Sequence, residues 1–455
     1  MPNDPQYSGL QTDLYELTMA AGYRAAGFDG VATFELFVRG LPARRNFLVA
    51  AGLAQALAYL ERINFSADEI GYLRRHPVFA EIDDDFFEFL ARFQFSGDVW
   101  AVPEGTVIFP DEPILRVTAP IAEAQIVETY LLSAIHFQTL IASKAARVVS
   151  AAKGCRVVEF GARRAHGPEA GVLAARAAFV GGCVGTSNVA AGFRFGIPTF
   201  GTQAHSWIMA FEDEKQAFGR FLDIFPKNAV LLLDTYDVRA ALETILAMGR
   251  KPRGVRLDSG DVAEASVWIR RRLDEAGWND VDIFASGDLD EDRIAEMLAR
   301  GARINAFGVG TALATSIDAP ALSVIYKLVE VQTGGTVREA AKFSTAKVTY
   351  PGKKQIFRRS DANGKFVEDV IALEGEKVPG AQPLLELAIR AGRAVAPAVD
   401  LGAAQRRCLE QVGRLPDAVR GLAKSPAYPV RHSERLVELL NEVRRRVERA
   451  ARAAR

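Results

Sequence analysis

The segment GIPTFGTQAHSWIMAF (Gly196–Phe211) contains a strand-like run, a turn and a helix-like run in succession. Pro198–Phe200 is a short apolar run beside glycine, which predicts a buried strand, and the apolar residues from Trp207 onwards predict a helix. His205 lies between them. In an α/β barrel the chemistry is done at the C-terminal ends of the strands, so His205 is a candidate acid, base or nucleophile. A core histidine bonded to a backbone carbonyl is the alternative.

Strand-like and helix-like runs alternate on both sides of this segment. The strand candidates are Val157–Phe160, Ala178–Val184, Pro198–Phe200, Ala229–Asp234, Gly254–Asp258, Asp282–Ala285, Asn305–Val309 and Ser323–Val331. The helix candidates are Ile121–Lys153, Val238–Gly249, Val262–Ala276 and Asp290–Arg300. This alternation predicts parallel strands with crossover helices. Seven or eight such units favour a closed barrel, although a doubly wound open sheet gives a similar pattern.

Composition limits the class of protein. A chain of 455 residues with 49% hydrophobic and 25% charged residues predicts two or three folded domains. Lys plus Arg equals Asp plus Glu at 56 each, so no net charge favours nucleic acid or membrane as a partner. The N-terminus lacks the pattern of a signal peptide. The separated cysteines, Cys155, Cys183 and Cys408, predict neither a disulfide framework nor a zinc site, and a cytoplasmic location is expected.

The two ends of the chain predict a second, discontinuous domain. A helix capped by Thr12 and Asp13 is expected to turn Leu14, Leu17 and Met19 inward, followed by a strand at 31–38 and a small β-rich region at 97–120. After Lys342, the dipeptides Pro351–Gly352 and Asn363–Gly364 predict hairpins. From His432 a helix with Leu436, Leu440, Val443 and Val447 at heptad-like spacing is expected to pack on the body.

The predicted organisation is therefore an irregular (β/α) barrel joined to an α/β sandwich domain, with a helical C-terminal tail. Residues 1–120 form the first part of the sandwich, 121–335 the barrel, 336–400 a β-rich segment that returns to the sandwich, and 401–455 the tail. The loop Arg39–Asn46 carries three arginines, which either hold an anion or are simply solvated.

Four polar motifs follow the predicted barrel strands. EFGARR offers paired arginines that match a carboxylate or phosphate, and in RLDSGD the alternation of a strand turns Arg256 and Asp258 the same way. That pair could also be purely structural. SGDLD and GVGT place small residues after the last strands, where free backbone N–H groups can bind a phosphate. The pocket candidates are Arg163, Arg256, Asp258, Ser286, Gly287, Gly308, Gly310 and Thr311.

In their order along the chain, these motifs resemble those of the nicotinate phosphoribosyltransferase family. The resembling segments are TDLYELTMAAGY, FELFVRGLP, EFGARRAHG, GTSNVAAG, GIPTFGTQAHSW, LLLDTYD, GVRLDSGD, SGDLDE, FGVGT and the β segment KFSTAKVTYPGKKQIFR. The resemblance extends from residue 12 to residue 358 and implies an irregular α/β barrel joined to a sandwich built from both chain ends. It also implies a homodimer with active sites near the interface.

The resemblance further implies a reaction. Nicotinate and 5-phosphoribosyl 1-diphosphate would give nicotinate mononucleotide and diphosphate, with ATP hydrolysis coupled through a phosphorylated histidine. By motif, His205 falls at the phosphorylated position, Tyr15, Thr202 and Arg256 at nicotinate-binding positions, and Thr311 at a position that binds the ribose 5-phosphate. Asp258 would bind the ribose hydroxyls or Mg²⁺, which is expected through the substrate phosphates. Arg163, Ser286, Gly287, Gly308 and Gly310 would complete the phosphate end.

Two rivals remain at this stage. One is a related enzyme that takes nicotinamide or quinolinate. The other is a catalytically silent protein that only binds nicotinate. Release of diphosphate with each base, with and without ATP, separates the three.

Overall fold

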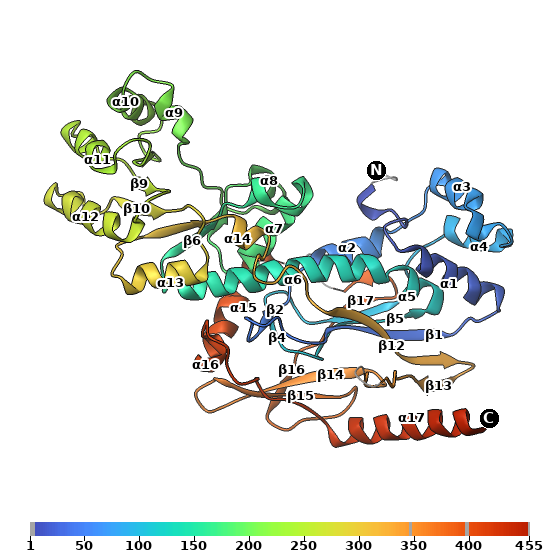
Figure 1. The fold of residues 1–455 in the computed structure, drawn as a ribbon. Helices are drawn as coiled ribbons and strands as arrows, with labels where there is room; N and C mark the ends of the chain where they lie inside the picture. The colour runs from blue at the N-terminus through green and yellow to red at the C-terminus, as the bar shows by residue number, and fades with distance from the viewer. Residues whose placement is uncertain (1–4, 345–347, 396–399, 454–455) are drawn as a thin grey trace. The chain divides into compact units, whose positions relative to one another are not determined.

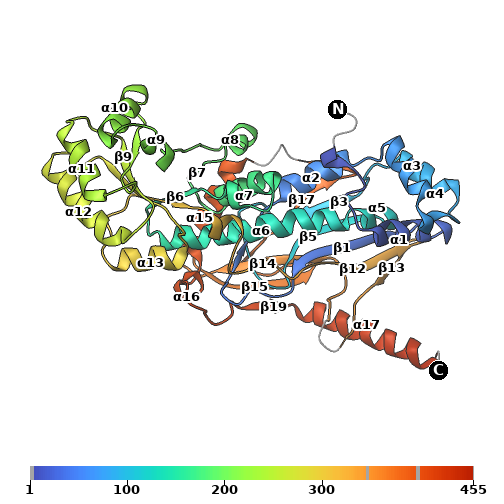
Figure 2. The ribbon, with the colours of Figure 1, turned by 45° about the horizontal axis from the view of Figure 1, so that its top comes forward.

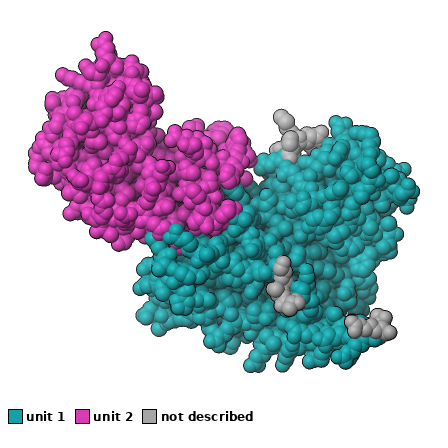
Figure 3. All heavy atoms as spheres, viewed as in Figure 1, with its two compact units in different colours: residues 1–139, 321–455 teal, residues 140–320 magenta. Residues whose placement is uncertain are grey.

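The computed structural model describes residues 5–344, 348–395 and 400–453. The chain forms two compact units (Figure 3): unit 1 comprises Met1–Thr139 and Ala321–Arg455, and unit 2 comprises Leu140–Pro320. These divisions differ from the boundaries drawn from the sequence at 120/121 and 335/336. The first division falls inside the helix α6 (Glu128–Ala151), which the apolar periodicity of 121–153 predicts as one element with the short α5 (Ile121–Ile126).

Unit 1 is built on an antiparallel sheet of seven strands in the order β13-β12-β1-β5-β3-β17-β18 (Figure 1). Their bounds are Thr336–Glu339, Val324–Thr333, Val31–Val38, Pro113–Pro120, Asp98–Ala101, Glu386–Arg390 and Arg393–Ala394. The strand predicted at 31–38 is confirmed, as is the β-rich region at 97–120, which also holds β4 (Val107–Ile108), the partner of β2 (Leu48–Val49). Segments from both chain ends therefore share one sheet.

One predicted barrel strand belongs to this sheet instead. The run 323–331 forms β12, but it pairs antiparallel with β1, from Val31 with Gln332 to Val38 with Val324. An apolar run predicts a buried strand but does not specify its sheet, so the expectation that this strand belongs to the barrel was wrong.

A second sheet of unit 1 contains β16 (Ala381–Pro383), β14 (Lys354–Ser360), β15 (Phe366–Leu373) and β19 (Val430–His432), in that order. The Asn363–Gly364 hairpin between β14 and β15 is confirmed. Pro351–Gly352 precedes β14 and does not connect two paired strands, and residues 345–347 of that predicted hairpin lie outside the described residues. The tail helix α17 (Glu434–Ala453; Figure 2) contacts β15 and buries Leu436, Leu440 and Val443, whereas Val447 is exposed.

The remaining helices of unit 1 are short. They are η1 (Pro5–Tyr7), α1 (Leu14–Ala25), α2 (Leu53–Arg62), α3 (Ala67–Arg75), η2 (Pro77–Phe79), α4 (Asp84–Ala91), α15 (Leu401–Arg414) and α16 (Asp417–Arg420). In α1 only Leu17 of the three predicted core residues is buried; Leu14 and Met19 are exposed in the single chain. In the loop after β1, Arg45 is fully buried, so it is not part of a solvated run.

Unit 2 contains a parallel sheet of six strands in the order β7-β6-β11-β10-β9-β8. Their bounds are Gly185–Thr186, Arg156–Glu159, Ala306–Val309, Asp282–Ala285, Gly254–Leu257 and Val230–Leu232. The crossover helices are η3 (Ala162–Arg164), α7 (Pro168–Val180), α8 (Val189–Phe195), α9 (His205–Met209), α10 (Glu214–Ile224), α11 (Val238–Ala247), α12 (Val262–Glu275), α13 (Glu291–Ala299) and α14 (Thr311–Ala314). Strand and helix alternate as the sequence predicts.

Two details of the predicted barrel differ. The strand expected at 178–184 is wrong, because Ala178–Val180 completes the alanine-rich helix α7 and the chain then turns at Gly182, whose φ is +105°. The segment Pro198–Phe200 contributes only a single bridge, between Thr199 and Thr186. Among the described strands the end strands β7 and β8 are not paired with each other, so the sheet is not closed by hydrogen bonds.

None of the helices in the described ranges combines the length and the apolar character needed to cross a lipid bilayer.

Candidate active site

The parallel strands of unit 2 bring distant polar residues to one edge of the sheet. In the register of β9 and β10, Phe284 lies beside Arg256 and Ala285 beside Leu257. Consequently Asp258 and Ser286 both follow at the C-terminal ends of these strands. Asp234 and Thr235 take the same place after β8. Because parallel strands end together, side chains about 25 to 30 residues apart in sequence meet here.

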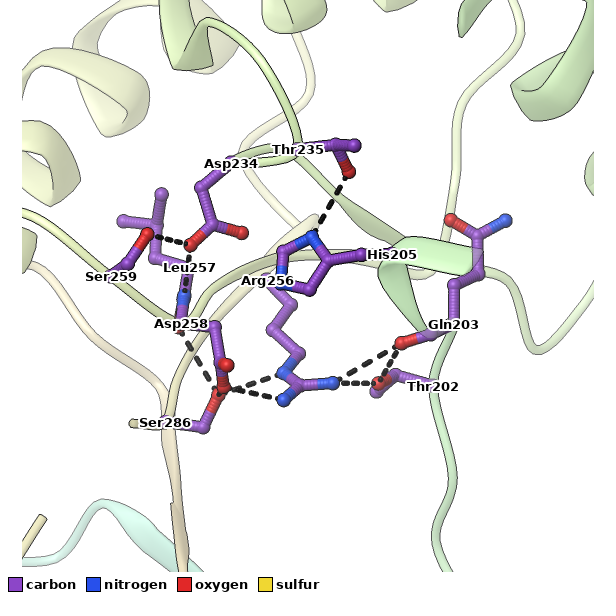
Figure 4. Close-up of polar contacts among 10 residues, drawn as sticks. All are labelled: Thr202, Gln203, His205, Asp234, Thr235, Arg256, Leu257, Asp258, Ser259 and Ser286. Carbon is purple, nitrogen blue, oxygen red and sulfur yellow. Dashed lines mark hydrogen bonds and ion pairs between the residues drawn. The ribbon is translucent and has the colours of Figure 1, made fainter. Parts of the chain in front are cut away.

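Arg256 is the centre of this cluster (Figure 4). Its Nε donates to Ser286 Oγ (2.7 Å), one terminal nitrogen donates to Thr202 Oγ1 (2.8 Å) and Gln203 O (3.2 Å), and the other forms an ion pair with Asp258 Oδ1 (2.5 Å). The predicted common orientation of Arg256 and Asp258 is confirmed. These contacts engage all three guanidinium nitrogens and fix the plane of the group, so an incoming anion would meet a charge of defined orientation.

Asp258 is held in its charged form. Burial alone would raise the pKa of this carboxyl, but the hydrogen bond from Ser286 and the charge and hydrogen bond of Arg256 outweigh burial, so its pKa is lowered. Its side chain remains 28% exposed and that of Arg256 14% exposed. Asp258 therefore stays ionised, and both side chains are still accessible to a ligand.

His205 is the first residue of α9, as expected for a residue at the end of a turn. Its Nδ1 lies 3.2 Å from Thr235 Oγ1 (Figure 4). Within the described part of the chain no hydrogen bond occupies Nε2, and the ring is only half-buried. One nitrogen is thus anchored and the other is available, which does not match a core histidine satisfied on a backbone carbonyl.

A cavity of about 210 Å³ opens at the same ends of the strands. It brings together the eight predicted residues Arg163, Arg256, Asp258, Ser286, Gly287, Gly308, Gly310 and Thr311, with Phe160, Arg164 and Asp288 completing the lining. The cavity therefore has arginines and N–H-rich loops on its walls, which suit a phosphorylated substrate.

The glycines that line this cavity differ in backbone conformation and in the space available for a side chain. Gly287 has φ of +92°, and a Cβ there would lie 1.9 Å from the carbonyl oxygen of Asp258. At Gly308 a Cβ would lie 2.4 Å from the Phe160 ring, which is a packing constraint. At Gly310 the nearest atom is Phe160 O at 3.1 Å, so this position has more room. Gly310 also caps α14, whose first N–H groups have no partner inside the helix.

Asp234 is a functional candidate that the sequence reasoning did not single out. Its Oδ2 accepts hydrogen bonds from Asp258 N (2.9 Å) and Ser259 Oγ (2.5 Å), whereas its buried Oδ1 has no hydrogen-bond partner among the described residues. An aspartate directly after the buried run Leu231–Leu233 was the available signal. Thr235 and Gln203 were also missed, since only the tertiary structure places them beside His205 and Arg256.

Glu159 of β6 supports the loop that carries the paired arginines. It accepts from the backbone N–H of Gly161 and from Thr186 Oγ1. Burial raises the pKa of this carboxyl, against the lowering effect of those bonds.

Tyr15, the remaining sequence-predicted site residue, belongs to unit 1. Its side chain lies on α1 and is 44% exposed. Partial burial raises its pKa, and the charges of Glu128 and Glu16 raise it further. The phenol is therefore neutral at physiological pH.

The three cysteines are free thiols. In the described ranges, no three His, Cys, Asp or Glu side chains are grouped so that they alone could hold a metal ion.

A parallel α/β sheet with an arginine-lined cavity of about 210 Å³ at its carboxyl edge is an arrangement typical of α/β enzymes that act on anionic substrates. Residues 10–136 match the model of the nicotinate phosphoribosyltransferase N-terminal domain, and residues 155–371 match that of the nicotinate phosphoribosyltransferase family. The chain belongs to the nicotinate phosphoribosyltransferase family.

Individual relatives agree with this assignment. A nicotinate phosphoribosyltransferase of Mycobacterium tuberculosis, pncB2, is 46% identical over 445 residues, covering 96% of this chain and 94% of the relative. The nicotinate phosphoribosyltransferase of Bacillus subtilis is 41% identical over 380 residues, covering 81% and 77%. The crystal structure of human nicotinic acid phosphoribosyltransferase superposes with a TM-score of 0.82 at 29% identity, covering 95% of this chain and 99% of that one.

Proposed function

We propose that this chain transfers the phosphoribosyl group of 5-phosphoribosyl 1-diphosphate to nicotinate in NAD biosynthesis, with ATP hydrolysis coupled through His205. The pyridine nitrogen attacks the anomeric carbon of the ribose with its own lone pair, and the bond from that carbon to the diphosphate breaks. Nicotinate mononucleotide and diphosphate result. Since nitrogen needs no deprotonation, the enzyme's tasks are to align the two substrates and to stabilise charge.

The observation that carries this proposal is the Arg256 cluster. Its guanidinium is oriented by Ser286, Thr202 and Asp258 yet remains accessible at the cavity. A planar, always-charged fork of this kind suits the carboxylate of nicotinate, with the Thr202 hydroxyl beside it. Tyr15 is proposed as a further nicotinate-binding residue on the strength of the TDLYE motif, and the active enzyme as a homodimer on the strength of the family.

Other residues that line the same cavity suit the phosphoribosyl donor. Arg163 and the backbone around Gly310 and Thr311 are proposed to bind the ribose 5-phosphate, with Ser286 and Gly287 completing the loop edge. Gly310 leaves room for close approach of a phosphate, whereas Gly308 is small because Phe160 packs on it.

Mg²⁺ fits the carboxylates at this edge. The partnerless buried oxygen of Asp234 and the ionised Asp258 offer the hard oxygen ligands that this cation takes, and substrate phosphates would supply the rest. When bound, the cation offsets the negative charge of the diphosphate. Asp258 also lies where it can accept hydrogen bonds from the ribose hydroxyls.

His205 is proposed as the site of phosphorylation. Thr235 holds Nδ1, so Nε2 would take the γ-phosphoryl group as its bond to the β-phosphate oxygen of ATP breaks and ADP leaves. The added charge of about −1.5 to −2 and the new acceptor oxygens would favour binding of the donor with its cation. Later attack by water would release phosphate and lower the affinity for product.

The parallel sheet is further proposed to curve into an irregular barrel with Pro198–Phe200 beside its open edge. The bridge from Thr199 to Thr186 and a cavity surrounded by five of the strands support this curvature.

Two assays test the proposal. Diphosphate release should require nicotinate and be stimulated by ATP, with nicotinamide and quinolinate much poorer; no release with any base would favour a silent nicotinate-binding protein. With γ-labelled ATP, an acid-labile label should map to His205. The His205→Ala variant should form product slowly, lose ATP stimulation and lose nicotinate-dependent ADP release. Full ATP stimulation in that variant, or a label on another residue, would reject the role of His205.

A further inference from the structure

The strands of unit 2 surround a second cavity at their opposite, N-terminal ends. Its volume is about 430 Å³, within the range of small-molecule sites, and it shares no lining residue with the cavity at the carboxyl ends. We call the cavity at the N-terminal ends the rear cavity and the cavity at the carboxyl ends the front cavity. Phe284 of β10 lines the rear cavity and Phe160 lines the front cavity. The two rings stack with their centroids 5.9 Å apart and an angle of 12° between planes, so they form a partition between the two spaces.

The rear cavity has an apolar interior and a charged entrance. Val158, Val230, Ala306 and the rings of Phe284 and Phe200 line the interior. The large, partly exposed side chain of Phe200 is unusual for a residue that only fills a core. The middle of the cavity is therefore suited to a flat apolar body and poorly suited to ordered water.

The entrance carries an excess of positive charge. Arg156 and Arg253 both approach a single oxygen of Asp282, at 2.6 and 3.3 Å. Two guanidinium groups thus share one carboxylate, and Asn228 adds a neutral amide to the same lining. A structural ion pair needs only one arginine, and the second leaves donors that an anion can satisfy.

We propose that this rear cavity is a second binding site, distinct from the substrate cavity, for a small aromatic carboxylate. The ring would lie among Phe284, Phe200 and Val230, and the carboxylate would bind Arg253 beside Arg156. An occupant would touch the partition formed by Phe160 and Phe284 from behind, on the side away from the reacting groups.

Benzoate is a suitable probe because it carries the carboxylate but lacks the pyridine nitrogen, so it cannot be consumed. Its binding to the full chain is measured by titration calorimetry in an Arg256→Ala background, which removes the carboxylate contact proposed for the front cavity. We expect one site to persist in that background. Benzamide, which has the same shape without the charge, should bind about tenfold more weakly, the effect of losing a charge-assisted hydrogen bond.

Matched variants locate the site. Arg253→Gln should weaken benzoate binding about tenfold as well, whereas Arg250→Gln should leave it unchanged, because Arg250 pairs with Asp223 outside the cavity. Val230→Phe should block binding by filling the interior while both arginines remain. Loss of the site in the Arg256→Ala background, equal binding of benzamide, or binding that is insensitive to Arg253→Gln would overturn the proposal.

Discussion

Two of the arginine–aspartate pairs, one from each unit, differ in how far they are enclosed by the protein. In unit 1, Arg358 of β14 and Asp369 of β15 face each other across the strands, with two contacts of 2.9 and 2.5 Å and side chains 3% and 0% exposed. Tyr428 and Gln411 supply further hydrogen bonds to the same pair. In unit 2, Arg256 and Asp258 share a single contact of 2.5 Å and open onto a cavity.

This difference in exposure distinguishes an arginine–aspartate pair that stabilises the fold from one that can bind a ligand. A fully enclosed pair cannot exchange its partners, and removal of one member leaves an uncompensated charge inside the fold. An accessible pair at the edge of a parallel sheet can accept a new anion while the fold stays intact. The predictions below test this distinction, beginning with the largest effect.

Arg358→Ala should lower the free energy of unfolding by about 3–5 kcal/mol, because Asp369 and the neighbouring Glu112 remain buried without their cation. Burial, and then the charge of Asp369, already raise the pKa of Glu112. Urea denaturation measures the change. The adjacent pair of Arg359 with Glu368 is partly exposed, so Arg359→Ala should cost less than about 1 kcal/mol. Equal losses in the two variants would remove the distinction between enclosed and open pairs.

Glu16 offers a further comparison, because its buried carboxyl group is bonded to hydroxyl groups and not to a cationic side chain. Glu16 of α1 is buried and accepts hydrogen bonds from Thr12 and Thr129. Burial raises its pKa to about 7, against the lowering effect of these hydroxyls. Between about pH 4.5 and pH 7 the unfolded chain would lose this proton while the folded chain keeps it, so stability falls as pH rises.

Glu16→Gln removes that titration. As pH rises from about 4.5 to about 7, the free energy of unfolding of the variant should therefore increase by about 3 kcal/mol relative to that of the parent. Above pH 7 the difference between the two free energies should stay constant. Denaturation series at several pH values would detect it. Parallel stability curves for the two proteins would contradict the raised pKa.

Two glycines of the front cavity provide the smallest contrast. Gly310→Val should raise the KM for 5-phosphoribosyl 1-diphosphate several-fold with a smaller change in Tm than at Gly308, because the added side chain intrudes on the phosphate and its Cβ lies 3.1 Å from Phe160 O, a milder contact than the 2.4 Å at Gly308. Gly308→Ala should instead lower Tm, since its Cβ would overlap the Phe160 ring. If Gly310→Val mainly unfolds the protein, Gly310 has a structural role and the phosphate site must lie elsewhere.

Much of unit 2 could be predicted because its signals are local. The alternation of strands with helices, and the i, i+2 spacing of Arg256 and Asp258, follow from the geometry of a parallel fold. The sheet to which β12 belongs could not be predicted, because β12 pairs antiparallel with β1, almost 300 residues away in the sequence. The helical end at 178–180 was ambiguous, since a short apolar run of alanine and valine fits either element.

Within the candidate site, residue type alone pointed to the members with reactive or charged side chains, and the members defined only by their tertiary contacts were missed. His205, Arg256 and Asp258 follow strand-like runs and are residue types that can do chemistry, so the sequence alone offers them as candidates. Asp234, Thr235 and Gln203 act through distances that only the tertiary structure sets, such as the 3.2 Å from Thr235 Oγ1 to the His205 ring.

The role of Arg256 is tested most directly by removing the carboxylate from the substrate and the guanidinium from the enzyme, separately and together. The ratio of kcat/KM for nicotinate to that for nicotinamide is measured in the parent chain and in Arg256→Ala, with both proteins shown to be folded. If the open pair binds the carboxylate, the preference for nicotinate should fall by about 1.5–3 kcal/mol, roughly ten- to 150-fold. An unchanged ratio in the folded variant would contradict the assignment of Arg256 and leave its pair with Asp258 as a structural one.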